Sequence, residues 1–140
     1  MLSEEAYNKF FRFSAWYDLI VTWPFATAFT LAFMWGSVFG PLNDTLGFAP
    51  LPELDVHAVL FGNFFGSVVV IWSLARLYIG DPRMGVFDGI GRVLFSIAMI
   101  NVLMSGISPI VWGFLVPEVL FAVVSLLGAP KSLLRPGVNA

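Results

Sequence analysis

Residues 92–131 read RVLFSIAMINVLMSGISPIVWGFLVPEVLFAVVSLLGAPK, and between the two basic ends Glu118 is the only charged residue. A membrane-spanning helix needs about 20 apolar residues at a rise of 1.5 Å per residue. The stretch is long enough for two spans, which we place at about 87–105 and 109–127. The sequence Gly-Ile-Ser-Pro at 106–109 predicts the turn between them, because it offers a glycine C-cap, a serine N-cap and a first-turn proline.

The same length argument, applied toward the N-terminus, predicts two more spans at about 16–38 and 57–77. Residues 1–15 have amphipathic helical spacing, which predicts either an interfacial helix or a cytoplasmic extension of the first span. Residues 128–140 are predicted to form a tail. The chain, 1–140, is long enough for one such transmembrane domain and for no separate soluble module.

The composition places the chain in the membrane class. Hydrophobic residues make up 59% of it and charged residues only 11%, against roughly 25% charged residues in an ordinary soluble domain. So few charges cannot cover a surface that faces water. We therefore predict an all-α integral membrane protein, folded as an antiparallel four-helix transmembrane bundle.

The basic residues predict the orientation. All seven lie in the N-terminal segment, around the connection between spans two and three, or in the tail, whereas the long loop at about 40–56 has only acidic charges. By the positive-inside rule both termini lie on the cytoplasmic side of a cytoplasmic (inner) membrane, and the asymmetry argues against dual topology. The basic residues are Lys9, Arg12, Arg76, Arg83, Arg92, Lys131 and Arg135; the acidic loop residues are Asp44, Glu53 and Asp55.

Several chemistries are excluded by residues that the sequence lacks. It has no cysteine, which removes thiol redox chemistry, iron–sulfur clusters and thiolate metal sites. His57 is the single histidine, so two axial histidines for haem cannot come from one chain and a metal role is disfavoured. The net charge of −2 gives no support for a nucleic-acid partner. We expect no cofactor and no metal.

Glu118 is the first candidate for a functional residue. It lies roughly 13 Å below the outer end of the fourth span by helix rise, near mid-membrane, where ionisable side chains are costly and commonly functional. Pro117 beside it predicts a local kink. Arg92 on the third span lies at a depth that its long side chain can bridge. The alternative is a glutamate that only holds helices together.

Three further charges lie near the inner interface. Asp18, Arg76 and Asp88 are at similar depth on the first three spans, and Asp88 precedes Arg92 by one helical turn. They predict an inner-interface charge network with a structural role. The alternative is that this network also binds a lipid phosphate or another anionic ligand.

The outer half carries its own polar residues. His57 opens the second span, and Asn63 and Asn101 lie deeper at matching levels on the second and third spans. With Glu118 they form a predicted polar trail from the external face to mid-membrane. The alternative for the asparagines is hydrogen bonding between helices.

Two backbone signals concern packing. Gly62 and Gly66 form a Gly-x-x-x-Gly motif, which predicts close helix approach, either inside the bundle or in a dimer. Pro24, flanked by Thr22 and Thr27, predicts an irregular first span, a feature that sometimes marks transporter sites.

These features favour a non-catalytic protein that binds a lipid-like, quinone-like or isoprenoid-like ligand in an intramembrane polar cavity. In size and span count the chain resembles small four-span proteins that bind sterols or isoprenoids, or that serve as cofactor-free subunits of membrane complexes. It would then contact membrane lipids, other subunits or further copies of itself. The alternatives are an oligomeric proton-coupled transporter with Glu118 as proton carrier, and a lipid isomerase or hydrolase with Glu118 as acid and base.

Overall fold

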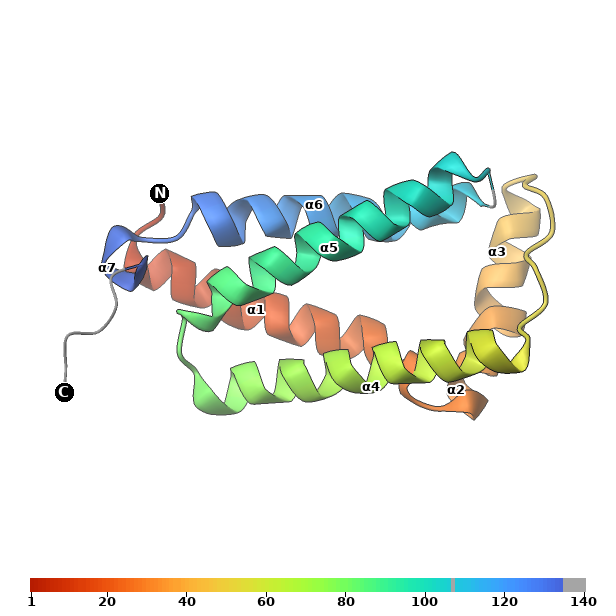
Figure 1. Ribbon diagram of the computed structural model, residues 1–140, viewed down its shortest axis with the longest axis horizontal. Coiled ribbons are helices and arrows are strands. Elements are labelled where there is room, and N and C mark those ends of the chain that lie inside the picture. Colours follow the sequence, from red (N-terminus) through yellow and green to blue (C-terminus); the bar gives the residue numbers. More distant parts are fainter. Residues whose placement is uncertain (107, 135–140) are drawn as a thin grey trace.

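The computed structural model describes residues 1–106 and 108–134, and within them the chain forms helices and turns without any strand. Figure 1 shows four long helices lying side by side, with the N-terminus and α7 at the same end. The long helices are α1 (Glu4–Thr22), α4 (Val56–Ile79), α5 (Met84–Met104) and α6 (Trp112–Leu127). The short elements are a 3₁₀ turn (Trp23–Ala26), α2 (Ala28–Met34), a π-helical turn (Trp35–Phe39), α3 (Gly40–Thr45), a second 3₁₀ turn (Pro109–Val111) and α7 (Lys131–Leu134). Residue 107 of the predicted turn and residues 135–140 of the predicted tail, Arg135 included, lie outside the described residues.

Three helical segments are long and apolar enough to cross a membrane: Val56–Ile79, Met84–Met104 and Pro109–Leu127, with mean hydropathies of 1.9, 1.7 and 2.3. A fourth span is obtained if the bent pair Glu4–Ala26 and Ala28–Thr45 counts as one. Large apolar side chains such as Phe61, Phe87 and Leu120 point outward from these helices, as expected where lipid rather than water is the solvent. The prediction of an all-helical chain with several membrane-spanning helices is confirmed, which indicates a membrane protein.

The first predicted span, 16–38, is not one straight helix. The helix α1 begins at Glu4, runs to Thr22 and passes into the 3₁₀ turn that holds Pro24. Thr27 is then extended and caps α2, with its hydroxyl accepting from the Thr30 N–H at 3.2 Å, so the chain turns by 103°. The turn follows from a proline without an N–H, followed by a threonine that starts a new helix. The irregularity predicted at Pro24 is present, but the prediction of one continuous span over residues 16–38 is wrong.

The chain after this turn crosses one end of the molecule. Figure 1 shows α3 running from the α4 side to the turn between α5 and α6. The predicted loop at 40–56 therefore begins as a helix, and only residues 46–55 are irregular. Asn43 is completely buried and explains the arrangement, because its Oδ1 accepts from Ser108 Oγ at 2.7 Å and its Nδ2 donates to Ala49 O at 2.6 Å. The polar side chain thus joins α3 to the α5–α6 turn.

The opposite end is closed by close packing of the N-terminus against α6. The Leu2 N–H donates to Gly128 O at 2.9 Å, and the hydroxyl of the buried Tyr7 donates to Ser125 O at 2.8 Å. Residues 4–15, predicted as either an interfacial helix or a cytoplasmic extension of the first span, are therefore continuous with residues 16–22 in α1 and pack against α4 and α6.

The turn between α4 and α5 is fixed by local chemistry. Gly80 adopts φ +67° at the end of α4, a conformation that an L side chain rarely adopts. Arg83 then donates to both carboxylate oxygens of Asp81, at 2.7 to 3.1 Å, and this guanidinium lowers the pKa of Asp81 below its usual value. The short turn reverses the chain, and α5 then runs away from α4 and packs against α6 (Figure 1).

The Gly-x-x-x-Gly motif is used inside the chain. A Cβ added at Gly62 would lie 2.8 Å from Leu31 Cδ2, and one added at Gly66 would lie 2.5 Å from the backbone N of Ala26. The motif therefore lets α4 contact the backbone that follows α1. Of the two interpretations of the motif, this geometry supports packing within the chain.

Candidate functional site

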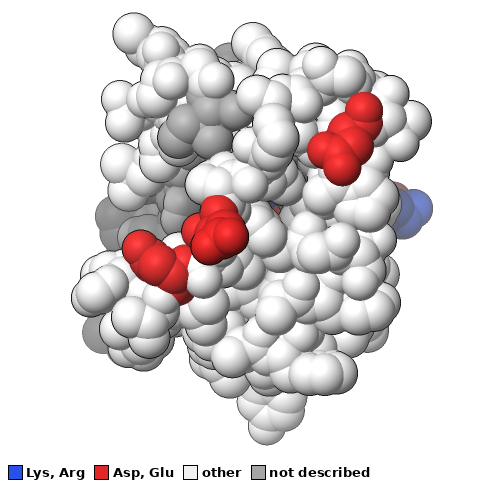
Figure 2. Space-filling model, turned by 90° about the vertical axis from the view of Figure 1, so that its right-hand side faces the viewer, with Lys and Arg blue, Asp and Glu red and all other residues white. Residues whose placement is uncertain are grey.

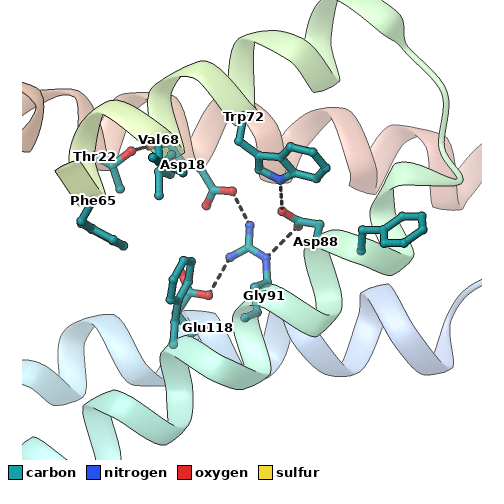
Figure 3. Close-up of a pocket in the computed structure, with 12 residues that line it drawn as sticks. Asp18, Thr22, Phe65, Val68, Trp72, Asp88, Gly91 and Glu118 are labelled. Atoms are coloured by element: carbon teal, nitrogen blue, oxygen red, sulfur yellow. Dashed lines mark hydrogen bonds and ion pairs between the residues drawn. The ribbon is translucent and has the colours of Figure 1, made fainter.

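Arg92 on α5 is the centre of a buried charge network. Its Nε donates to Asp88 Oδ2 at 2.9 Å, one nitrogen of its fork donates to Glu118 Oε2 at 3.1 Å, and the other donates to Asp18 Oδ2 at 2.5 Å. Figure 3 shows these three carboxylates, from α5, α6 and α1, pointing toward one guanidinium. The guanidinium also lies 4.9 Å from the centre of the Phe121 ring, a cation–π distance.

Arg76 extends the network to α4. Its side chain is fully buried, it lies 2.8 Å from Asp88 and it also pairs with Asp18. Ser14 and Ser73 accept further hydrogen bonds from it, each at 3.3 Å. Side chains from all four long helices therefore meet in one ionic network, which Trp72 on α4 completes by donating to Asp88 Oδ1 at 3.1 Å (Figure 3).

The network contains more acids than bases. Two guanidinium groups face three carboxylates, so one negative charge is in excess when all five groups are ionised. Glu118 is the least enclosed of the five: its side chain is 15% exposed, against 3% for Arg92 and none for Arg76. It makes one ion pair, whereas Asp18 and Asp88 each make two. A proton or a ligand that neutralises the excess charge has its easiest access at Glu118.

Two cavities lie against the network. The first, of about 240 Å³, lies beside Arg92 and is drawn in Figure 3; the second, of about 290 Å³, extends along α5 and α6 toward α3. They share four lining residues: Asp18, Thr22, Phe65 and Glu118. A third cavity of about 160 Å³ shares Phe25, Val102, Val111 and Phe114 with the second and reaches Trp35. Apolar walls therefore lead from the end crossed by α3 to the charged network.

The structure brings together the predicted charged residues. Glu118 and Arg92 meet, as their depths predicted, and the predicted inner group of Asp18, Arg76 and Asp88 joins them in the same network. The long arginine side chains explain the merger, because each guanidinium reaches carboxylates at different levels on neighbouring helices.

The outer polar trail is not formed as predicted. His57 is exposed in the first turn of α4, and the Asn101 side chain is exposed on α5. Asn63 is turned to the end of α1, where its Nδ2 donates to Phe25 O at 2.9 Å. The three side chains therefore face different surroundings and do not form a continuous path. Asn63 therefore connects helices, which was the alternative interpretation for the asparagines.

Sequence reasoning missed several residues of the site. One of them is Trp72, which precedes Arg76 by one turn on the same face of α4, a spacing that places both near the network. Phe65, which lines both main cavities, gave no signal in the sequence, and Thr22, which also lines both, was singled out only as a neighbour of Pro24. Within the described residues, no group of three or more histidines and carboxylates is arranged to hold a metal ion.

Comparison of the chain with family models, with curated proteins and with solved structures gave no match in any of the three.

Proposed function

We propose that this protein binds an apolar ligand with a polar head group, of the quinone or isoprenoid class, inside the membrane. The observation that carries this proposal is the pair of adjoining cavities whose shared wall contains Asp18 and Glu118. An apolar chamber with a few convergent polar groups is the usual form of a small-molecule site. Here the apolar walls would hold a chain or ring, and the carboxylates would hold the head.

The cavity walls offer a direct test. Ala98 and the neighbouring Ile97 on α5 are both exposed, but only Ala98 lines the second cavity, and Ile97 lines neither of the two main cavities. We expect Ala98→Trp to fill the cavity and remove co-purified ligand, and the matched control Ile97→Trp to keep it. Native mass spectrometry of the detergent-extracted protein measures the bound small molecules. Equal ligand content in both variants would contradict the proposed site.

A second candidate function is proton-coupled transport, and the excess carboxylate favours it. A group that gains and loses a proton suits a site with one surplus acid, and Glu118 borders cavities on two sides of the network. Transport of this kind in so small a chain would need an oligomer. The same native mass spectra report the oligomeric state and so separate this candidate from a closed binding protein.

For the membrane arrangement we propose an antiparallel four-helix transmembrane bundle with both termini on the cytoplasmic side of a cytoplasmic membrane. The charge distribution supports this orientation. Figure 2 views the end crossed by α3, where acidic groups are prominent and basic atoms appear only at one edge. Lys9, Arg83 and Lys131 lie at the other end of the long helices. Basic residues are retained on the cytoplasmic side during insertion.

A cysteine introduced into this cysteine-free chain tests the orientation. Thr45, at the end of α3, is exposed. We expect Thr45→Cys to react with a membrane-impermeant maleimide from outside intact cells, and Lys131→Cys to react only after the cells are permeabilised. The reverse labelling pattern would overturn the orientation.

A further inference from the structure

We infer that the ligand carries a hydrogen-bond-donating head, a hydroxyl or an ammonium group, and reaches the network from the bilayer through an opening between α4 and α5. This inference rests on the proposed ligand-binding function and narrows it to a route and to amphiphiles with a donor head, such as isoprenoid alcohols or reduced quinols. It excludes an oxidised quinone, whose carbonyl oxygens only accept hydrogen bonds.

The head group follows from the balance of donors and acceptors. Arg92 and Arg76 already direct their guanidinium groups to carboxylates, whereas Glu118 has one oxygen paired with Arg92 and a side chain that remains accessible at the wall shared by the cavities. The group that remains for a ligand is therefore the Glu118 carboxylate, a hydrogen-bond acceptor at which the network has its excess negative charge. A hydroxyl or an ammonium group satisfies it, a ketone or an ester does not, and a phosphate would be repelled by three carboxylates.

The route follows from which residues both line the first cavity and face outward. Val68 on α4 and Phe87 on α5 are each 67% exposed, yet both line the cavity beside Arg92. Gly91, one turn after Phe87 on α5, also lines this cavity. A Cβ built at Gly91 meets no atom within 4 Å. The cavity therefore reaches the outer surface between α4 and α5. Because this surface belongs to two membrane-spanning helices, it faces acyl chains and not water.

Among the described residues, one end of the molecule is closed by packing, and at the other end the third cavity lies beneath α3. Tyr7 and the contact of Leu2 with Gly128 close one end, and α3, held by Asn43 and Ser108, crosses the other. A ligand dissolved in the bilayer has the lateral opening as its direct path to Glu118, with its chain remaining between α4 and α5.

Three probes with the same eighteen-carbon chain test the head group: oleylamine, oleyl alcohol and methyl oleate. The protein is placed in phosphatidylcholine nanodiscs with each probe, and bound probe per protein is measured by native mass spectrometry. We expect the amine and the alcohol to be retained about tenfold more than the ester, the size of effect that one hydrogen bond to a charged group produces. A larger retention of the amine than of the alcohol assigns a charged head, and equal retention assigns a neutral one.

The variant Glu118→Gln, which keeps the side-chain shape but removes the excess charge, tests the residue. It should lower the retention of the amine relative to the ester, because the amide oxygen of glutamine accepts a hydrogen bond without a full negative charge. The route is tested by Gly91→Leu, which should slow uptake of oleyl alcohol from probe-loaded vesicles several-fold. Its matched control is Gly113→Leu on α6, where a Cβ also meets open space but no cavity wall.

Three different results would overturn the head group, the route and the proposed function separately. Equal retention of all three probes would leave a binding cavity but overturn the assigned head group. An uptake rate in Gly91→Leu equal to that in Gly113→Leu would overturn the lateral route while leaving the cavity. Absence of every probe from the wild-type protein would overturn the proposed function, and this inference with it.

Discussion

Replacing Arg92 with methionine should lower the free energy of unfolding by about 3–5 kcal/mol, because it leaves buried carboxylates without their shared partner. Arg92 contacts Asp18, Asp88 and Glu118, and its own side chain is 3% exposed. After the substitution, Arg76 would still pair with Asp18 and Asp88, whereas Glu118 would lose the one ion pair that it makes. Reversible unfolding in mixed micelles, followed by far-ultraviolet circular dichroism, measures the loss.

Replacing Glu118, the acidic partner of Arg92 on α6, should change the free energy of unfolding much less than replacing Arg92. Glu118→Gln removes the surplus acid and leaves Arg92 paired with Asp18 and Asp88, so we expect a change within about 1 kcal/mol, as for a weakly coupled, partly exposed pair. The double variant Arg92→Met with Glu118→Gln should recover part of the loss seen for Arg92→Met alone. Strictly additive effects in this cycle would show that the two side chains are not energetically coupled.

The second large effect is expected at Gly66, where α4 meets the backbone that follows α1. Gly66→Leu should destabilise the protein by about 3 kcal/mol or more, at the upper end of overpacking effects, because its Cβ would lie 2.5 Å from the backbone N of Ala26. A backbone atom cannot move aside as a side chain can, so α4 would have to separate from the turn at Trp23–Ala26. The same unfolding measurement in micelles reports this loss.

Alanine variants at three glycines separate the cost of the close contact from the general effect of replacing a helical glycine. Gly62→Ala should cost less than Gly66→Ala, because its nearest contact is the movable Leu31 side chain. Gly113→Ala meets open space and should be neutral or stabilising by about 0.5–1 kcal/mol, the usual preference for alanine in a helix. If Gly66→Leu instead left stability unchanged and altered only the oligomeric state, the motif would act between chains and not within one.

Much of the candidate site could be anticipated from single residues and helix rise. The depths of Glu118 and Arg92 along their spans predicted that the two side chains could meet, and they lie 3.1 Å apart. Helix rise also predicted similar depths for Asn63 and Asn101. Similar depth does not fix the rotation of either helix about its axis, and so does not fix the direction of the side chain. Asn63 faces the end of α1, and Asn101 faces outward. Rotation depends on how all four helices pack, which a single span does not encode.

The sequence by itself determined the class of structure, because long apolar segments with few charges have only one way to satisfy their backbone groups in lipid, as helices. It also indicated an irregularity at Pro24, but not that α1 ends at Thr22 and that a new helix begins after Thr27. Only the tertiary structure decided that Asp18, Arg76, Asp88, Arg92 and Glu118 form one network. The same holds for the path of the chain after Thr27, which crosses the end of the helices because Asn43 finds a partner in Ser108. The physical reason is that backbone hydrogen bonding in a span is satisfied locally, whereas a buried side-chain charge or amide is satisfied only by residues far along the chain.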